Sequence, residues 1–315
     1  MPTYTVPLFL ALSLLVHITY GTISPSDKKK SKTVQQLEPG SEDVFERDLV
    51  KEVFKVGDVL KHHRSYCNTK TKTRRFAGDV LGYVTPWNNR GYDIAKIFSP
   101  KFSYVSPVWL QLELSQETVT GFAVAGQHDV DVGWIQDVKS AGNGGKMVPR
   151  VLFEKWTPEL LTKVSASRKK MSAMAKTLVD VARKSGFDGY VLELWSQFGG
   201  HMTADVPGMF TKKDFDKLVD HVTAFSLMTY DYSSPQRPGP TSPIGWVRKC
   251  VELLAPEKGA QRAKILLGLN FYGYSYTSVG GGPILGSQLI QELSKSKKQA
   301  INWDDNAMEH YFEYK

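Results

Sequence analysis

The chain has 315 residues, of which 41% are hydrophobic, so it can bury a sizeable core in one large domain with an extension. Its formal net charge is +8, and much of the excess lies in residues 22–75, where 13 Lys/Arg stand against 8 Asp/Glu. The lysine run at 28–32 has no interleaved aromatic residue, which argues against a nucleic-acid-binding segment. A solvated leader is favoured over a docking patch for acidic glycans or membranes.

Residues 1–21 carry no charged side chain, and an apolar run over Leu8–Val16 leads to Thr19-Tyr20-Gly21. This pattern predicts a secretory signal peptide that is cut after Gly21. A membrane anchor is the alternative, but so short a run cannot cross a bilayer. We therefore expect a soluble mature protein in a lumenal or extracellular compartment.

The stretch 22–75 is expected to form a basic N-terminal extension. Residues 22–40 are polar and contain Pro25 and Pro39, which is typical of a disordered segment. The charged stretch 41–63 predicts one or two helices. The spacing of the two cysteines, Cys67 and Cys250, leaves a disulfide open, but Cys250 lies on the apolar stripe of a predicted helix, which favours a buried free thiol.

From residue 76 onward, apolar stretches of strand length alternate with amphipathic helical stretches. The six predicted strands cover Asp79–Thr85, Tyr104–Leu112, Lys146–Glu154, Gly186–Trp195, Ala224–Tyr230 and Lys264–Phe271. Strands of this kind favour a parallel barrel over an open sheet, so the fold class of residues 76–315 is predicted to be α/β, of the (β/α)8 TIM-barrel type. Pro149 costs the third strand a ladder hydrogen bond.

Several helices are marked by their termini. Asp131 is the expected N-cap of a helix over 132–140, and Thr157-Pro158 begins the next one. A longer helix keeps an apolar i, i+3, i+4 stripe and ends at Gly186. Further elements are a helix capped by Ser242-Pro243, a helix near 287–294 and a hairpin over 300–314.

We expect the barrel to be incomplete. Between Trp195 and Ala224 lie 28 residues, of which only 212–221 resemble a helix, so two crossovers and a strand do not fit. No stretch after Tyr272 has the pattern of a buried parallel strand. The fifth and eighth strands are therefore expected to be missing, which exposes sheet edges and predicts low stability.

Side chains alternate between two faces along the fourth predicted strand. Tyr190 and Leu192 fall on the outer face, whereas Glu193 and Trp195 fall on the inner face. The parity of the third strand lets Arg150 point into the barrel toward Glu193. An ion pair there would spare each charge the cost of uncompensated burial.

Four motifs follow one another along the chain: Val80–Tyr83 with Trp87, Asp188–Trp195, Met228–Asp231 and Lys264–Gly273. In this order they resemble strand motifs one, four, six and seven of glycoside hydrolase family 18, the chitinase family. Within that family, residues 63–67, 76–88 and 226–232 resemble a divergent branch most closely. The resemblance implies a barrel that binds amino-sugar oligosaccharides.

The resemblance places the catalytic acid of the family at Trp195, whose indole has no acidic proton to give. Family 18 enzymes cleave N-acetylglucosamine polymers by a substrate-assisted route, in which a glutamate at this position protonates the leaving oxygen. Glu193 lies two strand residues deeper, about 6.6 Å at roughly 3.3 Å per residue. A general acid must come within about 3 Å of its target. We therefore expect no hydrolysis by the family mechanism.

Aromatic and polar side chains gather at the C-terminal ends of the predicted strands, the face that carries the site in barrel enzymes. Rings offer flat faces to sugar C–H groups, and carboxylates and amides bind hydroxyl groups. The candidate saccharide-binding residues are Trp87, Trp109, Glu154, Glu193, Trp195, Met228, Tyr230, Asp231, Tyr232, Asn270 and Tyr272. Trp156 lies beside Glu154 in the same cluster, whereas Trp134 and Trp246 are expected to be packing residues.

No cofactor or metal is expected. His62-His63 and His128–Asp131 lack a recognised ligand spacing and fit surface or capping roles. Gly280-Gly281-Gly282 is expected to be a hinge, because it lacks the pattern of a phosphate-binding loop.

The sequence thus favours a secreted or lysosomal chitinase-like lectin for chitin-type or other amino-sugar oligosaccharides. The resemblance implies a role in innate immunity or endolysosomal sorting, with the scavenger receptor stabilin-1 as a partner. Two alternatives stay open. One is an active glycoside hydrolase with a relocated acid, at Glu154 or Asp231, and the other is a protein-interaction module with a vestigial groove.

Overall fold

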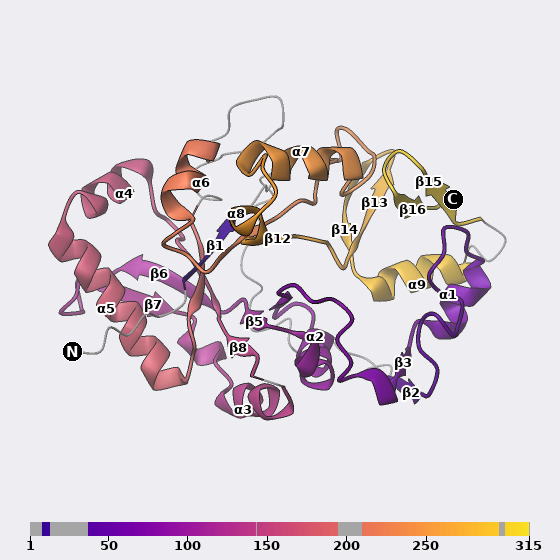
Figure 1. Ribbon diagram of the computed structural model, residues 1–315, viewed down its shortest axis with the longest axis horizontal. Helices are drawn as coiled ribbons and strands as arrows, with labels where there is room; N and C mark the ends of the chain where they lie inside the picture. Colours follow the sequence, from indigo (N-terminus) through magenta and orange to yellow (C-terminus); the bar gives the residue numbers. More distant parts are fainter. Residues whose placement is uncertain (1–7, 13–36, 143, 195–209, 296–299, 315) are drawn as a thin grey trace. The chain divides into compact units, whose positions relative to one another are not determined.

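The computed structural model describes residues 8–12, 37–142, 144–194, 210–295 and 300–314 (Figure 1). The chain divides into two compact units. Unit 1 takes in residues 1–15, 72–228 and 251–267, and unit 2 takes in residues 16–71, 229–250 and 268–315. Among the described ranges, no helix combines the length and the apolar character that a membrane span requires.

Unit 1 is built on parallel strands, as expected for the barrel class. Its strands are β1 (Leu8–Leu12), β4 (Leu81–Val84), β5 (Tyr104–Pro107), β6 (Leu110–Leu114), β7 (Phe122–Ala125), β8 (Lys146–Met147), β9 (Arg150–Leu152), β10 (Tyr190–Glu193), β11 (Ala224–Leu227) and β12 (Ile265–Leu267). One sheet has the order β12-β11-β1-β10-β9-β6-β7, and the other has the order β4-β5-β8. All neighbours pair in parallel except β6 and β7, which are antiparallel.

Two of the predicted strands are divided in the structure. The predicted second strand becomes β5 and β6, and the predicted third strand becomes β8 and β9. β5 pairs with β8 and β6 pairs with β9, so each divided strand still occupies one place in the barrel order. The third strand divides at Pro149, which has no N–H to donate to the ladder. The sequence predicted the lost bond but not the break.

β1 occupies the place between β10 and β11 that we expected to be empty, and Figure 1 draws it as the indigo arrow of the sheet. In its described part, the connection from β10 to β11 holds the helix α6 (Lys212–Leu218) and no strand. That this connection supplies no strand holds for residues 210–223, whereas residues 195–209 of the connection lie outside the described residues. The prediction of an empty fifth place is wrong, because the amino-terminal segment fills it. In the described ranges, no parallel strand follows β12.

The predicted helix termini at Asp131, Thr157 and Gly186 are confirmed, whereas the cap at Ser242 stays a prediction. The helices are α2 (Arg90–Ile97), α3 (Val132–Ala141), α4 (Pro158–Ser165), α5 (Arg168–Ser185), α7 (Ile244–Leu254) and α8 (Ala260–Ala263), with 3₁₀ turns at Asn68–Lys70, Ser99–Lys101 and Gln127–Asp129. The Asp131 carboxylate accepts a hydrogen bond from the Trp134 N–H at 2.9 Å and caps α3. Gly186 ends α5 with φ of 73°, a left-handed conformation that glycine adopts without a Cβ clash.

Besides the first part of α7, the described residues of unit 2 contain short strands and two helices. They are β2 (Glu38–Gly40), β3 (Ser65–Cys67), β13 (Gly273–Thr277), β14 (Gly280–Ile284), β15 (Asn302–Asp304), β16 (Glu309–Tyr311), α1 (Val56–His62) and α9 (Gly286–Lys295). β13 and β14 form one antiparallel hairpin, and β15 and β16 form the hairpin predicted over 300–314. The prediction of a hinge at 280–282 is wrong, because pairing with β13 holds these glycines in β14.

The basic extension is folded onto the C-terminal part of the chain within unit 2. Phe54 forms an antiparallel bridge with Ile301, and His310 Nε2 lies 2.8 Å from the Glu52 carbonyl oxygen. α1 is the helix found in the stretch predicted to be helical, and turns make up most of the rest. Cys67 and Cys250 are buried free thiols. Disorder was expected over residues 22–40. Residues 22–36 lie outside the described residues, and the prediction is wrong for Glu38–Gly40, because these residues form β2 and pair with β3.

Candidate functional site

Inside the barrel of unit 1, a charged pair joins two neighbouring strands. The Arg150 guanidinium of β9 lies 2.8 Å from a carboxylate oxygen of Glu193 in β10, which confirms the predicted ion pair. Glu193 is 2% exposed, and the ion pair offsets part of the cost of burying a carboxylate. In the part of the chain that the structure describes, Arg150 Nε and Ser106 Oγ are buried without a hydrogen-bond partner. The pair gives Glu193 a structural role and keeps it away from solvent.

A second polar contact spans the interior of unit 1 from the first strand to the sixth. Tyr83 Oη of β4 donates to Ser226 Oγ of β11 at 2.8 Å. Burial raises the pKa of Tyr83, so its hydroxyl stays protonated and acts as a neutral donor. This contact joins the sheet that contains β4 to the sheet that contains β11, so the two sheets of unit 1 face one another across its interior.

The strand-end residues of unit 1 fall into two groups. Trp87 follows β4 and is 53% exposed, and Glu154 follows β9 and is half-buried, so both remain accessible to a ligand. Trp109 is 1% exposed and Met228 is 5% exposed. Trp195 lies outside the described residues. We therefore exclude Trp109 and Met228, together with Glu193, from the residues that a ligand can reach in this conformation.

Trp109 is buried because a helix covers it. Its Nε1 donates to Tyr92 Oη of α2 at 2.7 Å, and its ring packs edge-on against Trp134 of α3 at 5.7 Å. The packing role predicted for Trp134 is thus confirmed. Trp156 is also a core residue, since its Nε1 donates to the Leu112 carbonyl at 2.9 Å. A position at a strand end does not by itself reveal whether a helix packs over the ring.

Unit 2 gathers four of the candidate residues into one cluster, which we call the tyrosine–aspartate site: Tyr230, Asp231, Asn270 and Tyr272. Tyr272 Oη donates to Asp231 Oδ1 at 2.7 Å, and the rings of Tyr230 and Tyr272 meet edge to face at 6.1 Å. Asn270 Nδ2 donates to the Tyr272 carbonyl at 2.6 Å, which holds the amide beside the ring. Two separate chain segments therefore converge on one carboxyl group.

The backbone and the surroundings of Asp231 are unusual. Its φ is 61°, in the left-handed region that non-glycine residues seldom adopt. Burial raises the pKa of Asp231, and the hydrogen bond from Tyr272 offsets part of that rise. Burial and the neighbouring carboxylate raise the pKa of Tyr272 as well, so its hydroxyl remains a donor. The site thus offers a carboxyl group, an amide and two phenol rings.

Tyr232, the remaining candidate of unit 2, has different neighbours. Its ring packs against Trp246 at 5.2 Å, and the Arg237 guanidinium lies 4.6 Å from its centroid. A cation over an aromatic face stabilises both groups. Since Tyr232 is 37% exposed, one part of its ring stays open to solvent. The packing role predicted for Trp246 fits this contact.

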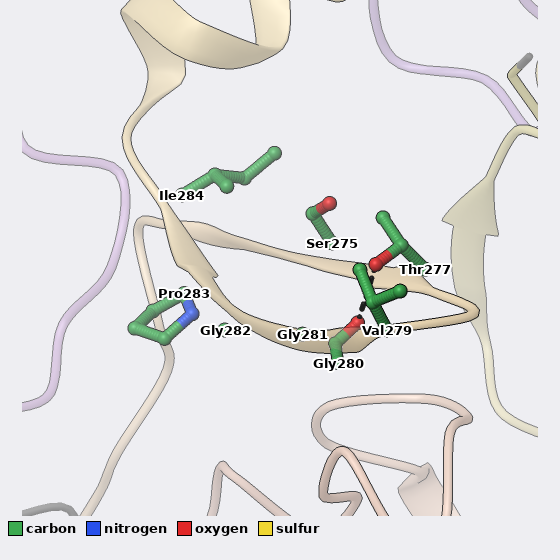
Figure 2. A pocket seen from close by; sticks show the side chains of 8 residues that line it. All are labelled: Ser275, Thr277, Val279, Gly280, Gly281, Gly282, Pro283 and Ile284. Carbon is green, nitrogen blue, oxygen red and sulfur yellow. Dashed lines mark hydrogen bonds between the residues drawn. The ribbon is translucent and has the colours of Figure 1, made fainter.

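A hollow elsewhere in unit 2 contains none of the candidate residues. Figure 2 shows it beside the hairpin of β13 and β14, where small and apolar side chains line it. Thr277 Oγ1 donates to the Gly280 carbonyl at 2.9 Å within its wall. Its lining has no ionisable side chain, so it offers little chemistry for a polar ligand. Across the described residues, no group of histidine, cysteine and carboxylate side chains is arranged to hold a metal ion.

A comparison of sequences relates part of this chain to known enzymes. Residues 201–315 match the family model of Glycosyl hydrolases family 18. The matched segment contains the whole tyrosine–aspartate site and ends beyond β16. It does not contain β10, on which the fourth motif of the sequence lies.

Solved structures share the fold of this chain. A class V chitinase from Pseudomonas fluorescens Pf-5 is 18% identical, with a TM-score of 0.58 over 75% of this chain and 80% of that chain. A GH18 chitinase variant from Cycas revoluta in complex with (GlcNAc)4 is 13% identical, with a TM-score of 0.51 over 74% and 84%. The spore cortex-lytic enzyme SleL from Bacillus cereus is 15% identical, with a TM-score of 0.53 over 75% of this chain, which spans 62% of SleL. The chain thus has the mixed α/β fold of the GH18 TIM-barrel chitinases.

Proposed function

We propose that the chain is a chitinase-like lectin, which binds chitin-type or other amino-sugar oligosaccharides at the tyrosine–aspartate site without cleaving them. The observation that carries this proposal is the 2.7 Å hydrogen bond from Tyr272 to Asp231, inside the segment that matches Glycosyl hydrolases family 18. The Cycas revoluta chitinase of the same fold was solved with (GlcNAc)4. An amino-sugar oligomer is therefore the first ligand class to test.

The chemistry of the site suits a sugar. A carboxylate has two oxygens and several lone pairs, so Asp231 can accept from a sugar hydroxyl or an acetamido N–H while it holds Tyr272. Two perpendicular phenol rings present both a face and an edge to the apolar side of a pyranose. Unit 1 has an exposed ring of its own at Trp87, which is a separate surface on which a sugar can stack.

The proposed absence of hydrolysis rests on the positions of the acidic side chains. The resemblance puts Trp195 at the position of the proton donor, and an indole cannot protonate a leaving oxygen. Glu193 is engaged by Arg150 at 2.8 Å and is nearly fully buried. A lectin is therefore favoured over a hydrolase that uses the mechanism of the family.

One observation keeps a second candidate function in view, namely a glycoside hydrolase with a relocated acid. Burial raises the pKa of Asp231, and a raised carboxyl pKa is what a general acid needs near neutral pH. Glu154, the other candidate acid, is half-buried and therefore also accessible. Release of reducing ends from (GlcNAc)4, lost in Asp231→Asn or Glu154→Gln, would establish this activity and overturn the lectin.

The deciding experiment is calorimetric titration of the full chain with (GlcNAc)4, and with cellotetraose as the sugar that lacks acetamido groups. We expect heat of binding with (GlcNAc)4 and none with cellotetraose. Tyr272→Phe removes a hydrogen bond to a charged group and is expected to weaken binding about tenfold. Tyr311→Phe, at an exposed tyrosine of β16, is the matched control and should leave the affinity unchanged. Absence of binding to every amino-sugar oligomer would favour the protein-interaction module.

We also propose a branch of the family and a cellular location for the chain. We propose that the chain belongs to the branch called chitinase domain-containing protein 1, or stabilin-1-interacting chitinase-like protein, on its three matching stretches. A secreted or lysosomal location, a role in innate immunity or endolysosomal sorting and binding to stabilin-1 follow from that assignment. Co-localisation of the tagged chain with a lysosomal marker tests the location, and binding to the purified stabilin-1 ectodomain tests the partner.

A further inference from the structure

The amino-terminal segment Leu8–Leu12 forms β1, which occupies the fifth place of the barrel sheet. β1 lies between β10 and β11 and pairs in parallel with both. Its register places Ala11 opposite Glu193 on one side and opposite Ser226 on the other. These two residues carry the polar contacts to Arg150 and Tyr83 that cross the interior of unit 1. β1 therefore lies between the two strands whose residues make these interior contacts.

The neighbouring strands need such a partner. β10 and β11 are buried strands, and a central parallel strand must pair its N–H and C=O groups on both edges. In its described part, the connection between them supplies a helix and no strand. Leu8–Leu12 reads Leu-Phe-Leu-Ala-Leu, without charge or proline, which is the composition of a strand buried on both faces. The segment thus fits this place by length, polarity and hydrogen-bonding capacity.

The same residues lie inside the predicted signal peptide, whose apolar run covers Leu8–Val16 and whose cleavage follows Gly21. A molecule that has lost residues 1–21 cannot contain β1. We propose that β10 and β11 form an acceptor slot for one extended apolar segment, that Leu8–Leu12 fills it in the uncleaved chain, and that cleavage after Gly21 makes this strand dissociable. The proposal is independent of saccharide binding and concerns how processing changes the barrel.

A pair of cysteine substitutions in the full chain tests the register. Ala11→Cys with Ser226→Cys puts thiols on partner residues of adjacent strands, which stand close enough for a disulfide. Leu10→Cys with Ser226→Cys is the matched control, because a shift of one residue turns the side chain to the opposite face. We expect a disulfide in the first variant and none in the second under oxidising conditions, mapped on non-reduced peptides. A disulfide in both variants or in neither would overturn the proposal.

A second measurement covers processing directly. A specific protease site is inserted after Gly21 in the full chain, and the folded protein is then cut. We expect the fragment to leave during gel filtration and Tm to fall by about 5 °C or more. A synthetic peptide of residues 6–14 then restores Tm, and the same peptide with Leu10→Pro does not. A fragment that stays bound through gel filtration would show that the cut strand does not dissociate. A fragment that leaves with Tm unchanged would show that the slot is not occupied by β1.

Discussion

Replacing Glu193 by glutamine is expected to destabilise unit 1 by about 3 kcal/mol. The substitution keeps the shape of the side chain but leaves the Arg150 guanidinium without its counter-charge. Breaking a buried pair by removing one partner costs about 3–5 kcal/mol, because one charge stays buried and uncompensated. Arg150 is 20% exposed at its side chain, so water relieves part of that penalty and the low end of the range applies.

The converse change is expected to cost more. Arg150→Met leaves the Glu193 carboxylate, which is 2% exposed, without its counter-charge. The free energy of unfolding is therefore expected to fall by about 4–5 kcal/mol. Combining both changes removes both charges, so the double variant should be about 2–3 kcal/mol more stable than the sum of the single losses predicts. The free energy of unfolding is measured by urea titration of all four proteins, followed by tryptophan fluorescence.

The control is an exposed ion pair of the same unit. Lys176 and Asp180 lie 2.6 Å apart on α5, with exposed side chains, and such pairs couple by about 0.3–0.5 kcal/mol. If the coupling energy of Arg150 and Glu193 is no larger than that of Lys176 and Asp180, the ion pair does not stabilise the interior of unit 1. The presence of Glu193 in the barrel would then have to be explained by a ligand.

Three further predictions concern the core, a helix terminus and the pH dependence of stability. Trp156→Phe removes the donor to the Leu112 carbonyl and leaves a cavity, so urea titration should show that the free energy of unfolding falls by about 2–3 kcal/mol. A fall below about 0.5 kcal/mol would contradict the buried contact. Ser167→Ala removes the N-cap of α5 and should lower stability by about 1 kcal/mol, whereas Ser172→Ala within the same helix should not lower it. The pKa of Asp231 is raised in the folded chain, so its contribution to stability is fully present below the ordinary aspartate pKa and is lost as pH rises through the raised value. Asp231→Asn should therefore flatten Tm over that pH window, and an unchanged slope would refute the assignment.

Much of the fold could be predicted because its signals are local. Caps at Asp131 and Thr157 act on N–H groups three residues away, so the sequence alone locates those helix termini. The alternation of side chains along a strand is also local, which is why the facing of Arg150 and Glu193 could be predicted from parity. The length of the connection after β10 could also be counted: the 28 residues between Trp195 and Ala224 are too few for two crossovers and a strand.

The features that the sequence misplaced depend on partners far along the chain. Trp109 is buried by α2 and α3, which the residues next to it in the sequence do not reveal. The misplaced strand at 280–282 is an exception, because its partner β13 ends only three residues before Gly280. The convergence of Asp231 and Tyr272 needs the relative positions of two segments 41 residues apart.

The sequence by itself determined the alternation of strands and helices, the helix caps and the inner face of the fourth strand, because each rests on periodicities of two to four residues. Only the tertiary structure decided that helices cover the Trp109 ring, that β1 pairs with β10 and β11, and that the Asp231 carboxyl group accepts a hydrogen bond from Tyr272. Those outcomes depend on burial and strand pairing between distant segments, which no local periodicity specifies.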